Sequence, residues 1–340
     1  MTHPAHIFGA ALDFLDDPDR LGLKLAYLNA LAEGRVALDL PADPYDAIAP
    51  LVKASSNGAA RLQGKVEVPG WLRPRPDLAD RELVRPEAYQ EFMDRGGFKL
   101  FVERCETKAA EILPETPVMI AVDHGLAAGP IRAASRHYGA GSLAVVVLDQ
   151  HFDAVSVAAR AQGIEPGFNG EGLCGDFLAG LMRGGAIRPE LLFVVGVGDF
   201  PRGRAADTAY GREYLSWVDK GVTVFCRDEV LASNFAERLT QGLRDSGARA
   251  VYVSLDADVG SGREMNAVRF GDYVGLPAKA VLAAARTLRS MMDQGDFRLA
   301  GLDVSEVDVH LLGLPGPEGE SDRTAEICAS FISILIGGEA

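Results

Sequence analysis

Carboxylate and imidazole side chains recur at strand-like spacing in three segments of this sequence. They are Asp149, His151 and Asp153 at the end of the apolar run LAVVVLD, Asp256 and Asp258 at the end of AVYVSLD, and His124 after VMIAVD. Because alternate residues of an extended chain point the same way, each set can present its polar groups to one side.

This set of side chains is suited to binding metal ions. Four carboxylates gathered without cations would repel one another and resist ionisation, and two divalent ions would remove that repulsion. Oxygen ligands with two imidazoles and no thiolate favour manganese, with nickel, cobalt and iron as alternatives. A pair of such ions can share a water, lower its pKa and hold hydroxide ready at neutral pH.

The elements that must position these groups are short, buried strands. Apolar, β-branched runs occur at Val118–Asp123, Leu143–Asp149, Leu191–Val197, Val222–Phe225, Ala250–Asp256 and Arg298–Val304. Runs that are apolar on both faces are typical of parallel strands covered by helices. Helical patterns at Glu237–Gly247 and Pro277–Met292 lie between or beside them. We expect an α/β fold, a three-layer sandwich with a mostly parallel central sheet, whose strand ends bring the polar groups together.

The first hundred residues are less regular. His6–Leu12 is compatible with an opening strand and Arg20–Gly34 with an amphipathic helix, whereas Lys65–Pro86 is rich in proline and charge and predicts an extended loop or hairpin. No repeat or low-complexity linker divides the chain. We therefore expect one domain over residues 1–340, with residues 1–100 as a decorated N-terminal part.

Composition excludes several classes of protein. The 340 residues carry a net charge of -14, which argues against nucleic acid as a partner. No apolar stretch is long enough to span a membrane and the N-terminus is not a signal peptide, so we expect no membrane association and a cytoplasmic location. The four cysteines form no C-x-x-C pair, which argues against a disulfide framework or a structural zinc site.

The polar segments resemble the motifs of the ureohydrolases, the superfamily of arginases and agmatinases. LDQHFDA resembles their D-A-H-x-D signature, SLDADVG their S-x-D-x-D segment, AVDHG a diverged G-G-D-H-S, and GLDVSEVDV their late G-x-D-x-x-E segment. The resemblance implies an arginase-like fold with two metal ions. His124, Asp149, Asp153 and Asp256 would hold one ion or bridge both, while His151 and Asp258 would complete the second site.

The resemblance also implies a reaction. A metal-bridging hydroxide would attack the guanidino carbon of the substrate and release urea, with Asp153 handling the proton. Glu306 would receive the substrate's guanidinium, because a carboxylate matches its planar fork of donors. Asp199, in a segment after a strand end, is a further candidate for substrate binding. Cys174 stands where the family has the histidine of a His-Gly pair, so it is a candidate proton shuttle or a structural cysteine.

Departures from the family pattern leave the substrate open. The G-G-D-H-S motif has become Val122–Gly125, and the segment after Asp153 is longer than the arginase loop that reads free arginine. These departures favour the peptide-arginase branch, which acts on arginine residues within peptides. A small guanidino molecule is the other expected partner, with agmatine, a guanidino acid or a formimino compound as alternatives. As in the family, we expect a homo-oligomer.

Two further interpretations remain open. A deacetylase of related fold holds a single zinc with an Asp-His-Asp set, and its metal content would distinguish it. A non-catalytic metal-binding module would bind ions without turnover on any guanidino or amide compound.

Overall fold

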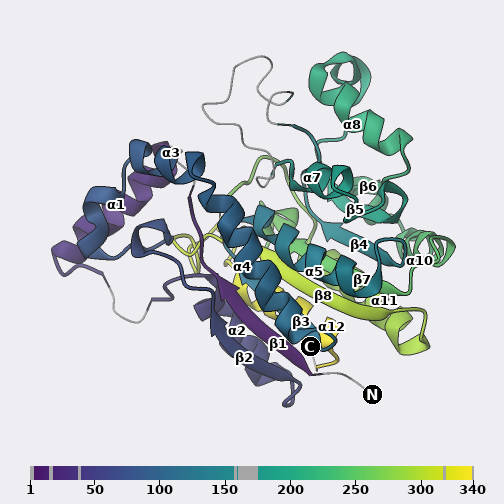
Figure 1. Ribbon diagram of the computed structural model, residues 1–340, viewed down its shortest axis with the longest axis horizontal. Helices are drawn as coiled ribbons and strands as arrows, with labels where there is room; N and C mark the ends of the chain where they lie inside the picture. Colours follow the sequence, from purple (N-terminus) through teal and green to yellow (C-terminus); the bar gives the residue numbers. More distant parts are fainter. Residues whose placement is uncertain are drawn as a thin grey trace.

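The computed structural model describes residues 4–14, 18–36, 40–156, 159, 175–316 and 319–338. Its centre is an eight-stranded sheet of order β2-β1-β3-β8-β7-β4-β5-β6, in which every pair of neighbours is parallel (Figure 1). The strands are β1 (Ala5–Ala10), β2 (Ala60–Lys65), β3 (Thr116–Ala121), β4 (Leu143–Leu148), β5 (Leu192–Val197), β6 (Thr223–Cys226), β7 (Ala250–Asp256) and β8 (Arg298–Ser305).

Helices cover both faces of this sheet. They are α1 (Pro18–Ala32), α2 (Pro44–Ser55), α3 (Pro86–Asp94), α4 (Gly97–Ile112), α5 (Ala128–Tyr138), α7 (Phe177–Arg183), α8 (Ala209–Asp219), α9 (Arg227–Val230), α10 (Phe235–Asp245), α11 (Ala278–Gln294) and α12 (Thr324–Ile336). Apolar residues of α1, α4, α5, α7 and α8 pack into one core cluster, and those of α2, α10, α11 and α12 into a second. The expected α/β three-layer sandwich is confirmed. None of the described helices is both long and apolar enough to cross a membrane.

The six predicted apolar runs match the six strands β3 to β8 to within two residues at each end. Strands β3, β4, β5 and β7 are buried along their whole length, which explains why they lack the alternation of polar and apolar residues. Strand β2 escapes prediction because five of its six residues, Arg61–Lys65, are exposed at the edge of the sheet.

The N-terminal residues contribute to the sheet itself. Strand β1 matches the predicted His6–Leu12 segment and lies between β2 and β3, with Ile7 paired to Val118. The proline-rich segment forms an irregular connection with two short 3₁₀ turns, Gly70–Leu72 and Leu78–Leu83. That residues 1–340 form one domain stays a prediction.

The order of the strands places four carboxyl ends side by side. β3, β8, β7 and β4 are neighbours at the middle of the sheet. His124, Glu306 and Asp149 follow β3, β8 and β4 at that edge, and Asp256 is the last residue of β7. In open parallel sheets the crevice beyond the carboxyl ends of the strands is where ligands bind. The fold therefore brings the candidate residues together from four separate parts of the chain.

Candidate metal centre

The chain leaves three of the central strands through the same local turn. Asp123, Asp149 and Asp256 each accept a hydrogen bond at Oδ1 from the backbone N–H two residues further on, at 2.9, 2.6 and 2.8 Å. An aspartate that bonds its own backbone in this way stabilises a sharp turn and competes with continued strand. In Asp149 and Asp256 the turn uses one oxygen and leaves Oδ2 facing the centre.

His124 is surrounded by three carboxylates. Its Nδ1 lies 3.4 Å from Asp149 Oδ2, 3.1 Å from Asp153 Oδ2 and 3.1 Å from Asp256 Oδ2. The side chains of these residues are at most 8% exposed. We call these four residues the first ligand group, because they offer one ligand atom each within 4.8 Å of one another.

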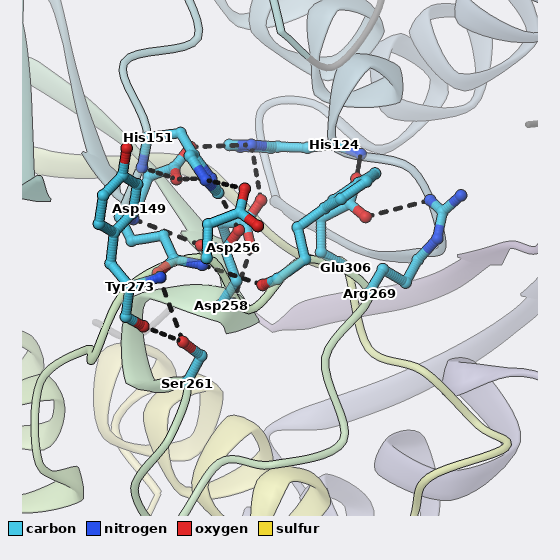
Figure 2. A network of polar contacts seen from close by, with 12 residues as sticks. His124, Asp149, His151, Asp256, Asp258, Ser261, Arg269, Tyr273 and Glu306 are labelled. Carbon is cyan, nitrogen blue, oxygen red and sulfur yellow. Dashed lines mark hydrogen bonds and ion pairs between the residues drawn. The ribbon is translucent and has the colours of Figure 1, made fainter. Parts of the chain in front are cut away.

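A second ligand group consists of Asp149, His151 and Asp258 and meets the same distance limit. His151 Nδ1 lies 3.0 Å from Asp258 Oδ2 and 3.7 Å from Asp149 Oδ1. The two groups share Asp149. Figure 2 shows the labelled aspartates converging between His151, which enters from the left, and His124, which enters from the right. The six predicted metal ligands therefore lie together.

The other ring nitrogen of His124 is held by a buried relay. Ser254 Oγ donates to Asp303 Oδ2 at 2.8 Å and lies 2.9 Å from His124 Nε2. Since the single hydroxyl hydrogen goes to Asp303, Nε2 must carry a proton and donate to Ser254. In the neutral ring this leaves the lone pair on Nδ1, which faces the carboxylates. Histidines that bind metals are commonly oriented by such a bond from their second nitrogen.

The charges of this centre are not balanced by the acids and imidazoles alone. Burial alone would lower the pKa of His151, but Asp258, Asp149 and Asp153 raise it to about 11. The pKa of His124 is likewise raised despite burial, by Asp149, Asp153 and Asp256. Burial raises the pKa of Asp256 well above its ordinary value, and the neighbouring Asp258 and Asp149 carboxylates raise it further. The pKa shifts of both histidines therefore have one cause, the carboxylates that face them, and these carboxylates favour positive charge at the centre.

The donor set fits divalent cations. Asp149 Oδ2 and Asp258 Oδ2 are buried and accept no hydrogen bond of good geometry from the described residues. Buried polar atoms normally have a partner. The nearest partners of these two oxygens are His124 Nδ1 at 3.4 Å and His151 Nδ1 at 3.0 Å, so both oxygens face their ligand groups, where a cation would be bound. Carboxylate oxygens and imidazole nitrogens without thiolate suit manganese-like ions. The side chains present therefore fit a two-ion cage.

Glu306 lies beside the first ligand group, but its carboxylate already has partners. Oε1 accepts the backbone N–H of His124 at 2.7 Å, and Oε2 accepts from Arg269 Nη1 at 3.1 Å. Its backbone φ of 60° is unusual for a residue other than glycine.

Asp199 is the remaining candidate that the structure describes, and it has partners of its own. Asp199 Oδ2 accepts the backbone N–H of Phe152 at 3.0 Å and a hydroxyl hydrogen bond from Tyr210. It thereby supports the turn that carries Asp149 and His151. Cys174 lies outside the described residues.

The sequence interpretation missed four residues that support the centre: Ser254, Asp303, Gln150 and Arg269. Gln150, between two ligands, donates from Nε2 to Phe270 O at 2.9 Å and accepts from the N–H of Tyr273 at 3.2 Å. Ser254 stands two residues before Asp256 in β7, so strand periodicity places both on one face of the sheet. That spacing was a usable signal for Ser254, whereas Arg269 lies in an irregular segment without any pattern.

Comparison with known proteins identifies the family and supports the fold. The profile of the arginase family matches residues 73–336. An arginase from Bacillus subtilis has a TM-score of 0.61 at 15% identity, with 99% of each chain covered. A formiminoglutamase from Trypanosoma cruzi, solved with Mn²⁺, has a TM-score of 0.60 at 15% identity, covering 98% of this chain and 92% of the other. A proclavaminate amidino hydrolase from Streptomyces clavuligerus has a TM-score of 0.56 at 18% identity, covering 98% and 91%.

No curated protein matches the sequence. The solved structures show the same fold, a parallel α/β sandwich. The profile match spans most of the chain, and the chain belongs to the arginase family. Resemblance to the ureohydrolases, first indicated by four short motifs, is thereby confirmed.

Proposed function

We propose that this protein is a hydrolase that uses two divalent metal ions to cleave a C–N bond of an amidino or guanidino compound. The observation that carries the proposal is the sharing of Asp149 by two ligand groups, which would hold a pair of ions side by side. A single-zinc deacetylase needs only one such group. Manganese is the proposed ion, with nickel, cobalt or iron as alternatives.

When bound, a pair of divalent ions in such a cage supplies an activated water and positive charge opposite the developing tetrahedral centre. The chain's own residues would orient the reactants. Ser254 and Asp303 fix the ring of His124, and Asp199 supports the turn that carries Asp149. Asp153, whose side chain is slightly more exposed than those of Asp149 and Asp256, is the proposed group that takes up the proton.

The substrate class follows from the chemistry shared by the three similar enzymes. Their names describe reactions on arginine, on a formimino group and on an amidino group, all of which have a carbon bonded to two or three nitrogens. We propose a guanidino substrate, with release of urea, and arginine within a peptide as one candidate. Cys174 as proton shuttle and Asp199 as substrate contact stay predictions from the sequence, as do a homo-oligomeric state and a cytoplasmic location. The sequence also predicts Glu306 as guanidinium receptor, a role in which a substrate would compete with Arg269, the present partner of Glu306.

A metal-reconstitution screen tests this function. Protein stripped of metal would be loaded with manganese or nickel, its metal content measured, and urea and ammonia assayed with free arginine, agmatine, guanidino acids, formimino compounds and arginine-containing peptides. We expect two ions per chain and product from at least one compound. Asp149→Asn should abolish turnover, whereas Asp245→Asn, on the exposed end of α10, should not. One zinc per chain with release of acetate from acetylated amines would instead show a deacetylase, and full turnover in Asp149→Asn would reject the site.

A further inference from the structure

A buried guanidinium of the chain itself lies next to the candidate metal centre. Arg269 belongs to the segment between the 3₁₀ turn Ala257–Gly260 and α11, and its side chain is only 2% exposed. Its Nη1 lies 3.1 Å from Glu306 Oε2, and its Nη2 donates to Asp13 Oδ1 at 3.0 Å. The carbonyl of Val122 accepts from Nη1 at 3.2 Å. Figure 2 shows this guanidinium on the outer side of Glu306, away from the carboxylates around His124.

These contacts belong to a hydrogen-bonded circuit of Arg269, Glu306, Val122 and His124, the last of which is a candidate metal ligand. Glu306 donates its backbone N–H to Val122 O at 3.0 Å, and Arg269 donates its own to Glu306 O at 2.9 Å. The Glu306 carboxylate then accepts the backbone N–H of His124. The position of His124 is therefore tied to Arg269 through both the backbone and the side chain of Glu306.

Charge explains why an arginine is needed at this place. Asp13, Asp123 and Glu306 are all buried, and Arg269 contacts each of them, Asp123 Oδ2 at 3.6 Å. A buried carboxylate without a cationic partner is costly, and the candidate cage adds four more carboxylates close by. A guanidinium satisfies several acceptors in one plane, which a lysine cannot do.

We propose that Arg269 is a positioning residue that acts as the permanent guanidinium partner of Glu306. It holds the Glu306 carboxylate against the backbone of His124 and so fixes one ligand of the cage. Glu306 is consequently not the receptor for a substrate's guanidinium, a consequence that rests on the proposed function. Recognition of the substrate must then use other groups around the cage.

Metal titration combined with chemical rescue tests the positioning role without any need for turnover. Arg269→Ala leaves a space for a small guanidinium ion, and Arg263→Ala is a matched control because Arg263 is exposed in the same segment. We expect Arg269→Ala to bind Mn²⁺ about 10–100-fold more weakly than the parent, as is typical for loss of a group that orients a ligand. Millimolar guanidinium chloride should restore much of that affinity, and should not change the affinity of the parent or of Arg263→Ala. Parent-like affinity in Arg269→Ala, or no recovery with guanidinium, would overturn the proposal.

Variants of similar size address the case in which Arg269→Ala fails to fold. Arg269→Gln and Glu306→Gln would be compared singly and together, with circular dichroism to verify folding. If Arg269 acts through Glu306, the double variant should lose no more Mn²⁺ affinity than whichever single variant loses more. The two effects are then not additive. Additive losses would contradict the circuit.

Kinetics on a confirmed substrate test the specificity part. At saturating Mn²⁺, Glu306→Gln should keep the KM of the parent. A KM raised tenfold or more would make Glu306 the guanidinium receptor and reject this part. If the parent hydrolyses no guanidino or amidino compound, the proposed function fails, while the titration and rescue still decide the role of Arg269.

Discussion

The sharpest perturbation of the candidate cage is a change outside it, Ser254→Ala. Ser254 binds neither proposed ion, yet its hydroxyl is the only described link between His124 Nε2, at 2.9 Å, and Asp303 Oδ2, at 2.8 Å. All three side chains are buried. Loss of the hydroxyl removes the bond that fixes the ring of His124 and selects the proton on Nε2.

Ser254→Ala should lower two measurable quantities, the free energy of unfolding and the affinity for Mn²⁺. Two buried polar groups lose their partner, and each such loss costs about 1–3 kcal/mol, so the free energy of unfolding should fall by about 2–6 kcal/mol in the metal-free protein. The affinity for Mn²⁺ should fall by about 10–100-fold, because an unsupported imidazole binds metal less well. Other ligands of the cage remain, so binding should weaken without being abolished.

Calorimetric titration of metal-free protein with Mn²⁺, together with urea denaturation, measures both quantities. Ser333→Ala is a matched control, because Ser333 is a buried serine on α12 whose Oγ contacts Ser55 Oγ at 2.7 Å, far in sequence from any proposed ligand. It should cost about 1 kcal/mol of stability and leave the affinity for Mn²⁺ unchanged. Unchanged affinity in folded Ser254→Ala would refute the claim that the relay orients a metal ligand.

Three further predictions follow from the same structure. Asp149→Asn should reduce binding at both ligand groups, and a metal analysis that still finds two ions per chain would exclude Asp149 as the shared ligand. His151→Asn should lower the Mn²⁺ content from two ions to one, because His151 belongs only to the second group; equilibrium dialysis distinguishes this from loss of both. Burial lowers the pKa of Lys24 from 10.5 to about 8 in the folded protein. Between pH 8 and pH 10.5 the unfolded chain therefore holds a proton that the folded protein has lost, so the free energy of unfolding rises with pH, by about 3 kcal/mol in total. Urea denaturation of Lys24→Met should lack this rise, and an identical pH profile would show that Lys24 does not cause it.

The parts of this molecule that were predictable are those governed by local rules. A strand buried on both faces needs an unbroken apolar run, as in Leu143–Leu148, so its place in the sequence is evident. The aspartates at the strand ends were also evident, because strand periodicity and the preference of aspartate for turns act within three residues. Strand β2 follows no such rule. Its sequence, ARLQGK, has a mostly exposed surface, and only its pairing with β1 makes it a strand.

The supporting residues were harder to predict because their partners are distant in the chain. The partners of Arg269 are Asp13, 256 residues earlier, and Glu306, 37 residues later. Neither spacing is periodic, and an arginine in an irregular segment is usually exposed. The pairing becomes visible only when the order β1-β3-β8 brings the ends of these strands together.

This difference bears on how far a family motif can be transferred. Candidate metal ligands are the part of a motif whose residue types are most constrained, because carboxylates gathered in one buried place need cations to neutralise their charge. A lone glutamate such as Glu306 is less constrained, since any cation that reaches it can satisfy it. Here the chain supplies that cation itself, in Arg269. The motif around Glu306 therefore predicts where the glutamate lies at the edge of the sheet. It does not predict which cation binds the glutamate, because that depends on a residue from another part of the chain.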